Sequence, residues 1–469
     1  MDRLSAIDAS FLAQERGGSH MHIGGILVFE GPPPTREEFL DHIESRLHLV
    51  PRYRQKLVFP RLEMGRPLWV DDPRFNIDYH VRHTALPDPG SIEQLRLMAA
   101  RIFSQRLDRS KPLWEVWLVQ GLEEDRFALV SKTHHSVVDG VAGVDLSAVL
   151  FDLDREPSAS PGREREWIAE PEPSQAQVIA EGVKGLVSTP FELAERAARS
   201  VSSPLRTLEE VREGLEGVSD ALGSFVSPAP STPLNVPIGT HRRLTWVGTE
   251  LDDLKAIKNA LGGTVNDVFL AVVTGALARW LRSRGVETDG LELRGAVPVS
   301  VRGQDERGGP LGNRITMMVG PLPVYADDPV ERLGIVTEAM RGLKESKQAL
   351  GAEVIAGLQD FAPPTIFARA SRINFSTRLY NLLVTNVPGP QFPLYLLGRE
   401  LEELVPVAFL ASRRALAVAI MSYNGSAAIG LISDYDAMAD LDVFAEAVEI
   451  SIEELLVAAE ARGGSPARA

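Results

Sequence analysis

The 469-residue sequence contains no cysteine, which removes a whole class of chemistry from consideration. Without thiols the chain has no disulfides, no thiolate metal site and no cysteine nucleophile. An excess of positive charge is also missing, because 49 Lys and Arg residues face 64 Asp and Glu residues and the net charge is −15. We therefore expect no nucleic-acid partner, and any contact with a membrane must come from local apolar surface.

Long apolar runs are missing as well. No stretch of about 18 uncharged apolar residues suits a membrane span. The run that begins at Val265 carries Asp267 and Arg279, and the run that begins at Leu382 is interrupted by three prolines. The N-terminus lacks the basic start and the apolar core of a secretory signal. We therefore expect a cytoplasmic protein that does not span a bilayer.

What the chain does contain is enough apolar material for a large core. Apolar residues make up 44% of the chain and charged residues 24%, as in globular proteins, and the length predicts two or three packed units. Segments rich in proline occur near residue 155 and again at 227–239. We expect an N-terminal domain at 1–155, a crossover linker with amphipathic helices at 156–239, and a C-terminal domain at 240–469.

Both halves alternate strand-like and helix-like segments, which predicts an α/β (α+β) fold in which each domain is a sheet with flanking helices. Capping boxes predict helix starts after Thr35 and Ser91, and Thr264 or Asn266 caps a long apolar helix. Strands before the linker are predicted at 20–31, 112–122 and 126–135. Asn424-Gly425 predicts a hairpin turn.

Two adjacent histidines, His134 and His135, end the third of these strands, and three residues separate them from Asp139 and Gly140. A neutral imidazole accepts a proton from a hydroxyl or an amine near pH 7. Neighbouring side chains of a strand point to opposite faces, so one histidine faces the site and the other supports the loop. Alternation alone does not decide which. Asp139 would orient the loop or an imidazole, and Gly140 would allow a tight bend.

Two further histidine pairs raise the question of a metal site. His20 and His22 alternate onto one strand face, and His80 and His83 have an H-x-x-H spacing. Neither pair has carboxylates at ligand spacing, and no phosphate-binding glycine loop occurs. We therefore expect no metal and no cofactor.

The motif HHSVVDG resembles the HHxxxDG motif of the acyl-CoA-dependent acyltransferase superfamily, which includes chloramphenicol acetyltransferase and peptide-synthetase condensation domains. Six other segments, in order and over nearly the full length, resemble the bacterial wax ester synthase/diacylglycerol acyltransferase family: LSAIDASFLAQE, PLWEVWLV, VNDVFLAVV, VPVSVR, LGNRITMM and TNVPGP. The resemblance implies two chloramphenicol-acetyltransferase-like domains, each with a mixed sheet. It places the active site at their interface, reached by acyl-CoA from one side and by an alcohol from the other.

The same resemblance implies the chemistry and the roles of the motif residues. His135 would be the general base that deprotonates the hydroxyl of diacylglycerol or a long-chain alcohol, which attacks the acyl-CoA thioester directly. His134 would support it. Asp139 would be structural and pair with an arginine, for which Arg302 is the candidate. A solvated turn residue is the alternative for Arg302.

Four further residues are implied to bind substrate, and each has a structural alternative. Asn266 and Asp267 would lie near the catalytic histidine, although helix capping also explains this pair. Glu15 matches a family carboxylate near the site, whereas an exposed helix position is the ordinary reading. Asn386, in TNVPGP, either closes the acceptor tunnel or ends a strand. Pro112, Leu113 and Trp114 are expected to pack in the core.

These features predict an O-acyltransferase that associates peripherally with the inner membrane face or lipid inclusions, with apolar linker positions such as Val178 and Ile179 as candidate lipid contacts. Packing of the linker against the domains is the alternative. Two other functions stay open: an acyltransferase with an amine or polyketide hydroxyl acceptor, and a non-catalytic lipid-body-binding protein.

Overall fold

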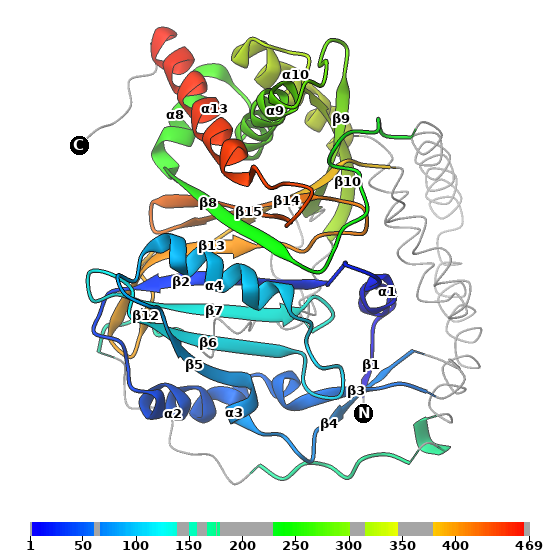
Figure 1. Ribbon diagram of the computed structural model, residues 1–469, viewed down its shortest axis with the longest axis vertical. Coiled ribbons are helices and arrows are strands. Elements are labelled where there is room, and N and C mark those ends of the chain that lie inside the picture. The colour runs from blue at the N-terminus through cyan, green and yellow to red at the C-terminus, as the bar shows by residue number, and fades with distance from the viewer. Residues whose placement is uncertain are drawn as a thin grey trace, which may run out of the picture.

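The fold consists of two six-stranded mixed sheets, one above the other, with helices on their outer faces (Figure 1). The computed structural model describes residues 2–60, 66–137, 150–156, 167–174, 176–178, 228–300, 315–345 and 379–463. The strand order is β12-β13-β2-β7-β6-β5 in the lower sheet and β10-β9-β11-β14-β15-β8 in the upper sheet. The predicted α/β fold with mixed sheets and flanking helices is confirmed.

The lower sheet is antiparallel except where β5 pairs with β6. Its strands are β2 (His22–Phe29), β5 (Val81–Ala85), β6 (Trp114–Gln120), β7 (Phe127–His134), β12 (Tyr395–Leu396) and β13 (Arg399–Val407). A small sheet beside it contains β1 (Asp2–Arg3), β3 (Gln55–Val58) and β4 (Leu68–Asp71). The helices of this half are α1 (Ala6–Gln14), α2 (Arg36–Arg46), α3 (Ile77–His80) and α4 (Ile92–Ser104). Short 3₁₀ turns cover Leu47–Leu49 and Pro51–Arg54.

The outer face of the upper sheet is covered by helices (Figure 1). Its strands are β8 (Arg242–Glu250), β9 (Glu292–Ser300), β10 (Ile315–Pro323), β11 (Leu382–Pro388), β14 (Leu416–Tyr423) and β15 (Ser426–Asp434). The helices are α8 (Leu251–Leu261), α9 (Val265–Ser283), α10 (Pro329–Glu345) and α13 (Leu441–Ala461).

Local signals locate several element ends correctly. The capping boxes at Thr35, Ser91 and Thr264 are all formed and begin α2, α4 and α9. The turn between β14 and β15 has positive φ at Asn424 (43°) and Gly425 (89°), as expected for this dipeptide in a tight hairpin. Each of these devices involves residues no more than three apart, so short sequence patterns predict them well.

Strand β13 was not predicted, and it joins the two halves of the chain. It pairs with β2 from Leu401 opposite Phe29 to Val407 opposite Gly24, so a C-terminal segment completes the N-terminal sheet. β15 of the upper sheet approaches β13 closely, because a Cβ at Gly430 would lie 1.9 Å from the Pro406 carbonyl oxygen. The seam between the sheets therefore requires glycine at this position.

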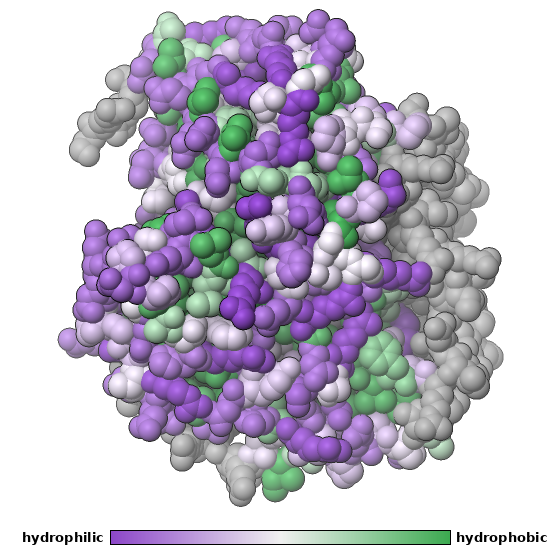
Figure 2. Space-filling model, in the orientation of Figure 1, coloured by the Kyte–Doolittle hydropathy of each residue, from purple (hydrophilic) through white to green (hydrophobic). Residues whose placement is uncertain are grey.

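The apolar core has three layers that follow this arrangement. One layer lies between the lower sheet and α2 and includes Trp114 and Phe39. A second lies between the two sheets, with α4 inserted, and includes Phe103 and Trp246. The third packs α8, α9, α10 and α13 onto the upper sheet around Trp280. The face of the molecule shown in Figure 2 is mainly hydrophilic, with apolar residues in small separated groups.

Within the described residues no single helix is long and apolar enough to cross a bilayer. Helices α8 and α9 meet these criteria only when taken together, and the pair is bent by 96°. Val178, a candidate lipid contact, is buried against Leu68 and Val70. Residues 179–227, which include Ile179, lie outside the described residues.

Candidate active site

The two motif histidines lie where β7 ends. His134 is the last residue of β7 and pairs with His22 on β2, and its N–H donates to the Leu113 carbonyl at 2.9 Å. His135 begins a turn, and its N–H donates to the Met21 carbonyl at 2.8 Å. The backbone of both histidines is thus held by the two neighbouring strands. Asp139, Gly140 and Arg302 lie outside the described residues.

The side chain of His134 is buried and held as a neutral imidazole. Its Nδ1 accepts from the Ser136 N–H at 3.1 Å and lies 2.7 Å from the Ser136 hydroxyl. An acceptor Nδ1 leaves the proton on Nε2, which lies 3.9 Å from a Glu15 oxygen. Burial, followed by the charge of Arg109, lowers the pKa of His134 to about 3. His134 therefore has no accessible nitrogen for a substrate.

The imidazole of His135 has different neighbours. It lies against Phe11, with 4.0 Å between ring centroids, and approaches Phe409 edge-on at 5.6 Å. Nδ1 is enclosed and has no hydrogen-bond partner among the described residues. Burial lowers the pKa of His135 to about 4, against a smaller opposing effect of its own backbone. The ring is consequently neutral at pH 7 and able to accept a proton.

Glu15 follows α1 and lies behind the histidines. Its side chain is only 5% exposed, and the guanidinium of Arg109 donates to it through Nε at 2.9 Å and also through Nη2. One oxygen is 3.7 Å from Nε2 of His22. The carboxylate that was predicted to bind substrate is therefore occupied by Arg109 and turned toward buried imidazoles.

Two of the other predicted substrate-binding residues contact each other. Asn386 near the end of β11 donates through Nδ2 to Oδ1 of Asn266, at the start of α9, over 3.3 Å. Both side chains are partly exposed. The two amides thus form one polar group on the upper half of the molecule.

Asp267, the third predicted residue of this region, caps α9. Its Oδ2 accepts from the N–H and the hydroxyl of Thr264, each at 2.8 Å. The residue is 3% exposed, and Oδ1 has no hydrogen-bond partner within the part of the chain that the structure describes. The capping role that the sequence suggested as the alternative accounts for this carboxylate.

Of the four histidines in the pairs with possible metal-ligand spacing, His20, His22 and His80 are buried and His83 is exposed. His20 and His22 have ring centroids 5.5 Å apart, and burial is the main cause that lowers both pKa values, to about 4 for His20. His80 stacks on Trp114, and its Nδ1–H donates to the Trp114 carbonyl at 2.8 Å. Among the described residues, no three His, Asp or Glu side chains form a metal-binding group.

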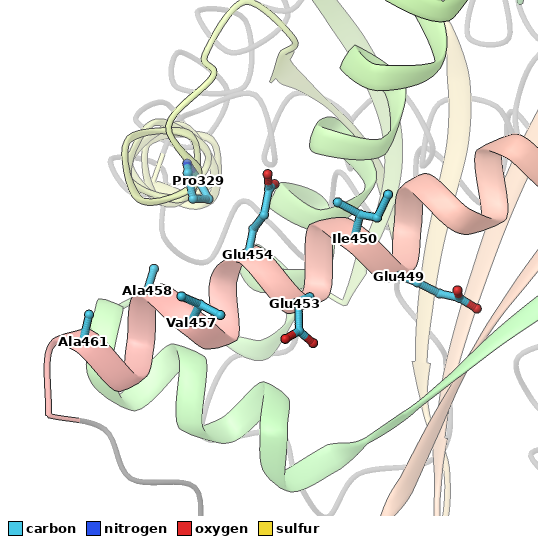
Figure 3. Close-up of a pocket in the computed structure, with 8 residues that line it drawn as sticks. All are labelled: Pro329, Glu449, Ile450, Glu453, Glu454, Val457, Ala458 and Ala461. Atoms are coloured by element: carbon cyan, nitrogen blue, oxygen red, sulfur yellow. The ribbon is translucent and has the colours of Figure 1, made fainter.

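Two surface grooves are separate from these histidines. One, of about 620 Å³, runs along α13 beside Pro329 and is lined by Ile450 and Val457 (Figure 3). The other, of about 590 Å³, lies between β8, β13 and α13. Neither groove is lined by His134 or His135.

Sequence reasoning missed three residues around the histidines: Phe11, Arg109 and Phe409. A buried phenylalanine has no pattern that separates it from ordinary core, and Arg109 lies 94 residues from Glu15. One signal was available, because Phe11 and Glu15 are four residues apart and therefore share a face on a helix.

Comparison with known proteins identifies the family. Residues 4–269 match the wax ester synthase/diacylglycerol acyltransferase catalytic domain, and residues 311–456 match the C-terminal domain of the same proteins. A putative diacylglycerol O-acyltransferase of Mycobacterium tuberculosis is 32% identical, over 97% of this chain and 90% of the relative. The O-acyltransferase WSD of Acinetobacter baylyi is 30% identical over 93% of each chain.

Solved structures agree with these matches. The wax ester synthase/diacylglycerol acyltransferase from Marinobacter aquaeolei VT8 superposes with a TM-score of 0.69 at 25% identity, over 98% of this chain and 100% of that one. A trichothecene 15-O-acetyltransferase from Fusarium sporotrichioides shares the fold, with a TM-score of 0.60, 15% identity and coverage of 97% and 94%. The chain therefore belongs to the wax ester synthase/diacylglycerol acyltransferase family of O-acyltransferases.

Proposed function

We propose that the protein moves a long-chain acyl group from acyl-CoA to the hydroxyl of diacylglycerol, of a long-chain alcohol, or of both. His135 is the general base, and no covalent acyl-enzyme forms. The observation that carries this proposal is the neutral imidazole of His135, held between residues of both halves of the chain. The absence of cysteine agrees with direct transfer.

The proposed acyl transfer requires no cofactor. Because Nδ1 is enclosed, we assign the proton transfer to Nε2 of His135. Nε2 takes the hydroxyl proton while the acceptor oxygen bonds to the thioester carbonyl carbon. The carbon–sulfur bond then breaks, and the CoA thiolate takes the proton from the imidazolium and leaves as the thiol. Asn266 and Asn386 are the proposed amides that bind a substrate oxygen, a role that suits their mutual contact.

Acceptor choice is tested by a competition assay. Purified protein receives palmitoyl-CoA with diacylglycerol, hexadecanol and hexadecylamine together, CoA release is measured, and lipids are separated by thin-layer chromatography. Triacylglycerol, wax ester or both is the expected product. Amide as the main product would replace the proposed acceptor class, and no CoA release with any acceptor would favour a lipid-binding role.

The pH dependence of turnover provides a second test. Only neutral His135 acts as a base, so activity is lost as pH falls through the pKa of about 4. At pH 6.0 such a group is about 99% neutral, whereas an unperturbed histidine is only about a quarter neutral. We expect kcat/KM at pH 6.0 to stay close to its value at pH 7.5. A fall to about a quarter would contradict the neutral, buried base.

The proposed substrates partition into lipid, so we also propose peripheral association with the inner membrane face or with lipid inclusions. Co-flotation of the purified protein with diacylglycerol-containing vesicles tests this. Protein that stays entirely in the dense fraction would contradict it.

A further inference from the structure

Two phenylalanines from opposite ends of the chain enclose the imidazole of His135. Phe11 lies at a tilt of 31° to the imidazole plane, and Phe409 is nearly perpendicular to it at 84°. The two phenyl rings also contact each other, with centroids 6.3 Å apart. Phe11 is 7% exposed and Phe409 is 5% exposed, so both contacts are shielded from water.

Helix α1 fixes the position of Phe11. The Ser5 side chain caps its N-terminus by accepting from the Asp8 N–H. At the other end Arg109 donates to the Leu12 carbonyl at 3.0 Å and holds Glu15. The helix lies at the edge of the lower sheet where β2 begins (Figure 1). Helix α1 therefore presents Phe11 to His135, and Glu15, which follows the helix, lies near His134.

Phe409 is held from the other side of the seam. It follows β13, and the neighbouring Leu410 carbonyl accepts from the Ser19 hydroxyl at 2.8 Å. Ser19 lies two residues before Met21, whose carbonyl accepts the His135 N–H. The backbone of His135 and the loop with Phe409 are thus tied to the same short segment.

Among the described residues the imidazole has few other restraints on its rotation. A catalytic histidine is ordinarily oriented by a hydrogen bond to the nitrogen that does not react. No other described residue hydrogen-bonds to Nδ1 of His135, and the one polar effect on the ring comes from its own backbone. Rotation about the Cβ–Cγ bond is intrinsically soft, so ring packing is the main restraint that the rest of the described chain provides.

We propose that Phe11 is a positioning residue for acyl transfer: its ring orients the imidazole of His135 and stabilises the imidazolium that forms when the proton is taken. Phe409 restrains the same ring from the perpendicular direction. An aromatic face attracts a cation, and the attraction is largest in a site shielded from water. This inference rests on the proposed role of His135 as the general base.

The test replaces Phe11 by leucine, which keeps an apolar side chain but removes the ring. Phe39→Leu is the matched control, because Phe39 is 1% exposed in the layer below the lower sheet and is not in ring contact with His135. We expect Phe11→Leu to lower kcat about tenfold with little change in the acceptor KM. Phe39→Leu should lower the melting temperature about as much as Phe11→Leu does, but its kcat should stay at the parental value. Phe11→Tyr, which retains the ring, should recover most of the rate.

Three outcomes would overturn the inference. Equal kcat for Phe11→Leu and Phe39→Leu would remove the positioning role, as would Phe11→Tyr no better than Phe11→Leu. A higher acceptor KM at unchanged kcat would make Phe11 a wall of the acceptor site. His135→Ala in the same assay distinguishes failure of the proposed mechanism from failure of this inference. Full turnover by His135→Ala would contradict the mechanism. If His135→Ala is inactive, only the role of Phe11 is in question.

Discussion

His135→Ala protein is expected to release CoA at a rate lower by on the order of 10² to 10⁴ than the parent protein. The substitution removes the only side chain that we assign to proton transfer, and the acceptor hydroxyl is too weak an acid to ionise unaided at pH 7. Binding of acyl-CoA and acceptor should survive, so the loss should appear in kcat and not in KM. The measurement is steady-state CoA release with saturating palmitoyl-CoA and either acceptor.

A second buried histidine provides the control. His80 is 1% exposed and stacks on Trp114, and none of its ring contacts among the described residues is with His134 or His135. His80→Ala should lower the melting temperature but leave the rate per folded molecule close to that of the parent. Parental turnover by folded His135→Ala protein would exclude the general-base mechanism.

Glu115→Ala is expected to cost about 3–5 kcal/mol of unfolding free energy, the largest stability effect that we predict. Lys132 is fully buried, and its Nζ lies 2.5 Å from Oε1 of Glu115. It also donates to the carbonyls of Ile102 and Gln105, at 2.7 and 3.0 Å. These carbonyls carry no net charge, so loss of the carboxylate leaves an uncompensated ammonium group on β7, the strand that also carries His134. Chemical denaturation followed by circular dichroism measures the change.

The pH dependence of this loss has a definite sign. Burial lowers the pKa of Lys132, and Glu115 opposes that shift. Without Glu115 the folded-state pKa falls further below the unfolded value, so stability is present at high pH and is lost as pH falls. The variant should therefore be less destabilised relative to the parent at pH 9.5 than at pH 7. A deficit that is independent of pH would mean that lost packing, and not the buried charge, causes the effect.

Two further variants isolate the charge. Lys255 forms an exposed pair with Asp252 at 2.8 Å, so Lys255→Ala should change stability by less than about 1 kcal/mol. Adding Lys132→Met to Glu115→Ala removes the orphaned ammonium group and should recover much of the loss.

Secondary structure was predicted best where the signal is short. Thr35, Ser91 and Thr264 begin helices through contacts with residues three positions away. β6 and β7 follow from alternating and β-branched segments. In contrast, no strand was predicted at β13 (RELEELVPV), which is rich in charged residues. It is a strand because β2, some 370 residues earlier in the chain, provides hydrogen bonds along one edge.

The sequence likewise predicted some features of the candidate site and missed others. The sequence motif identified His134 and His135 as a pair, and strand alternation predicted that they have different surroundings. The sequence did not reveal that Arg109 pairs with Glu15 or that Phe11 packs on His135. It also did not show that Asn266 meets Asn386, 120 residues later.

By itself the sequence determined the chemistry that is available: an imidazole pair, no thiol, an acidic surface and the order of the family segments. Those are properties of residue type and spacing, which do not depend on the fold. Only the tertiary structure decided the surroundings that give each histidine its character. Burial, ring packing and ion pairing join residues that are distant in sequence, and these contacts keep His134 inaccessible while His135 stays neutral between Phe11 and Phe409.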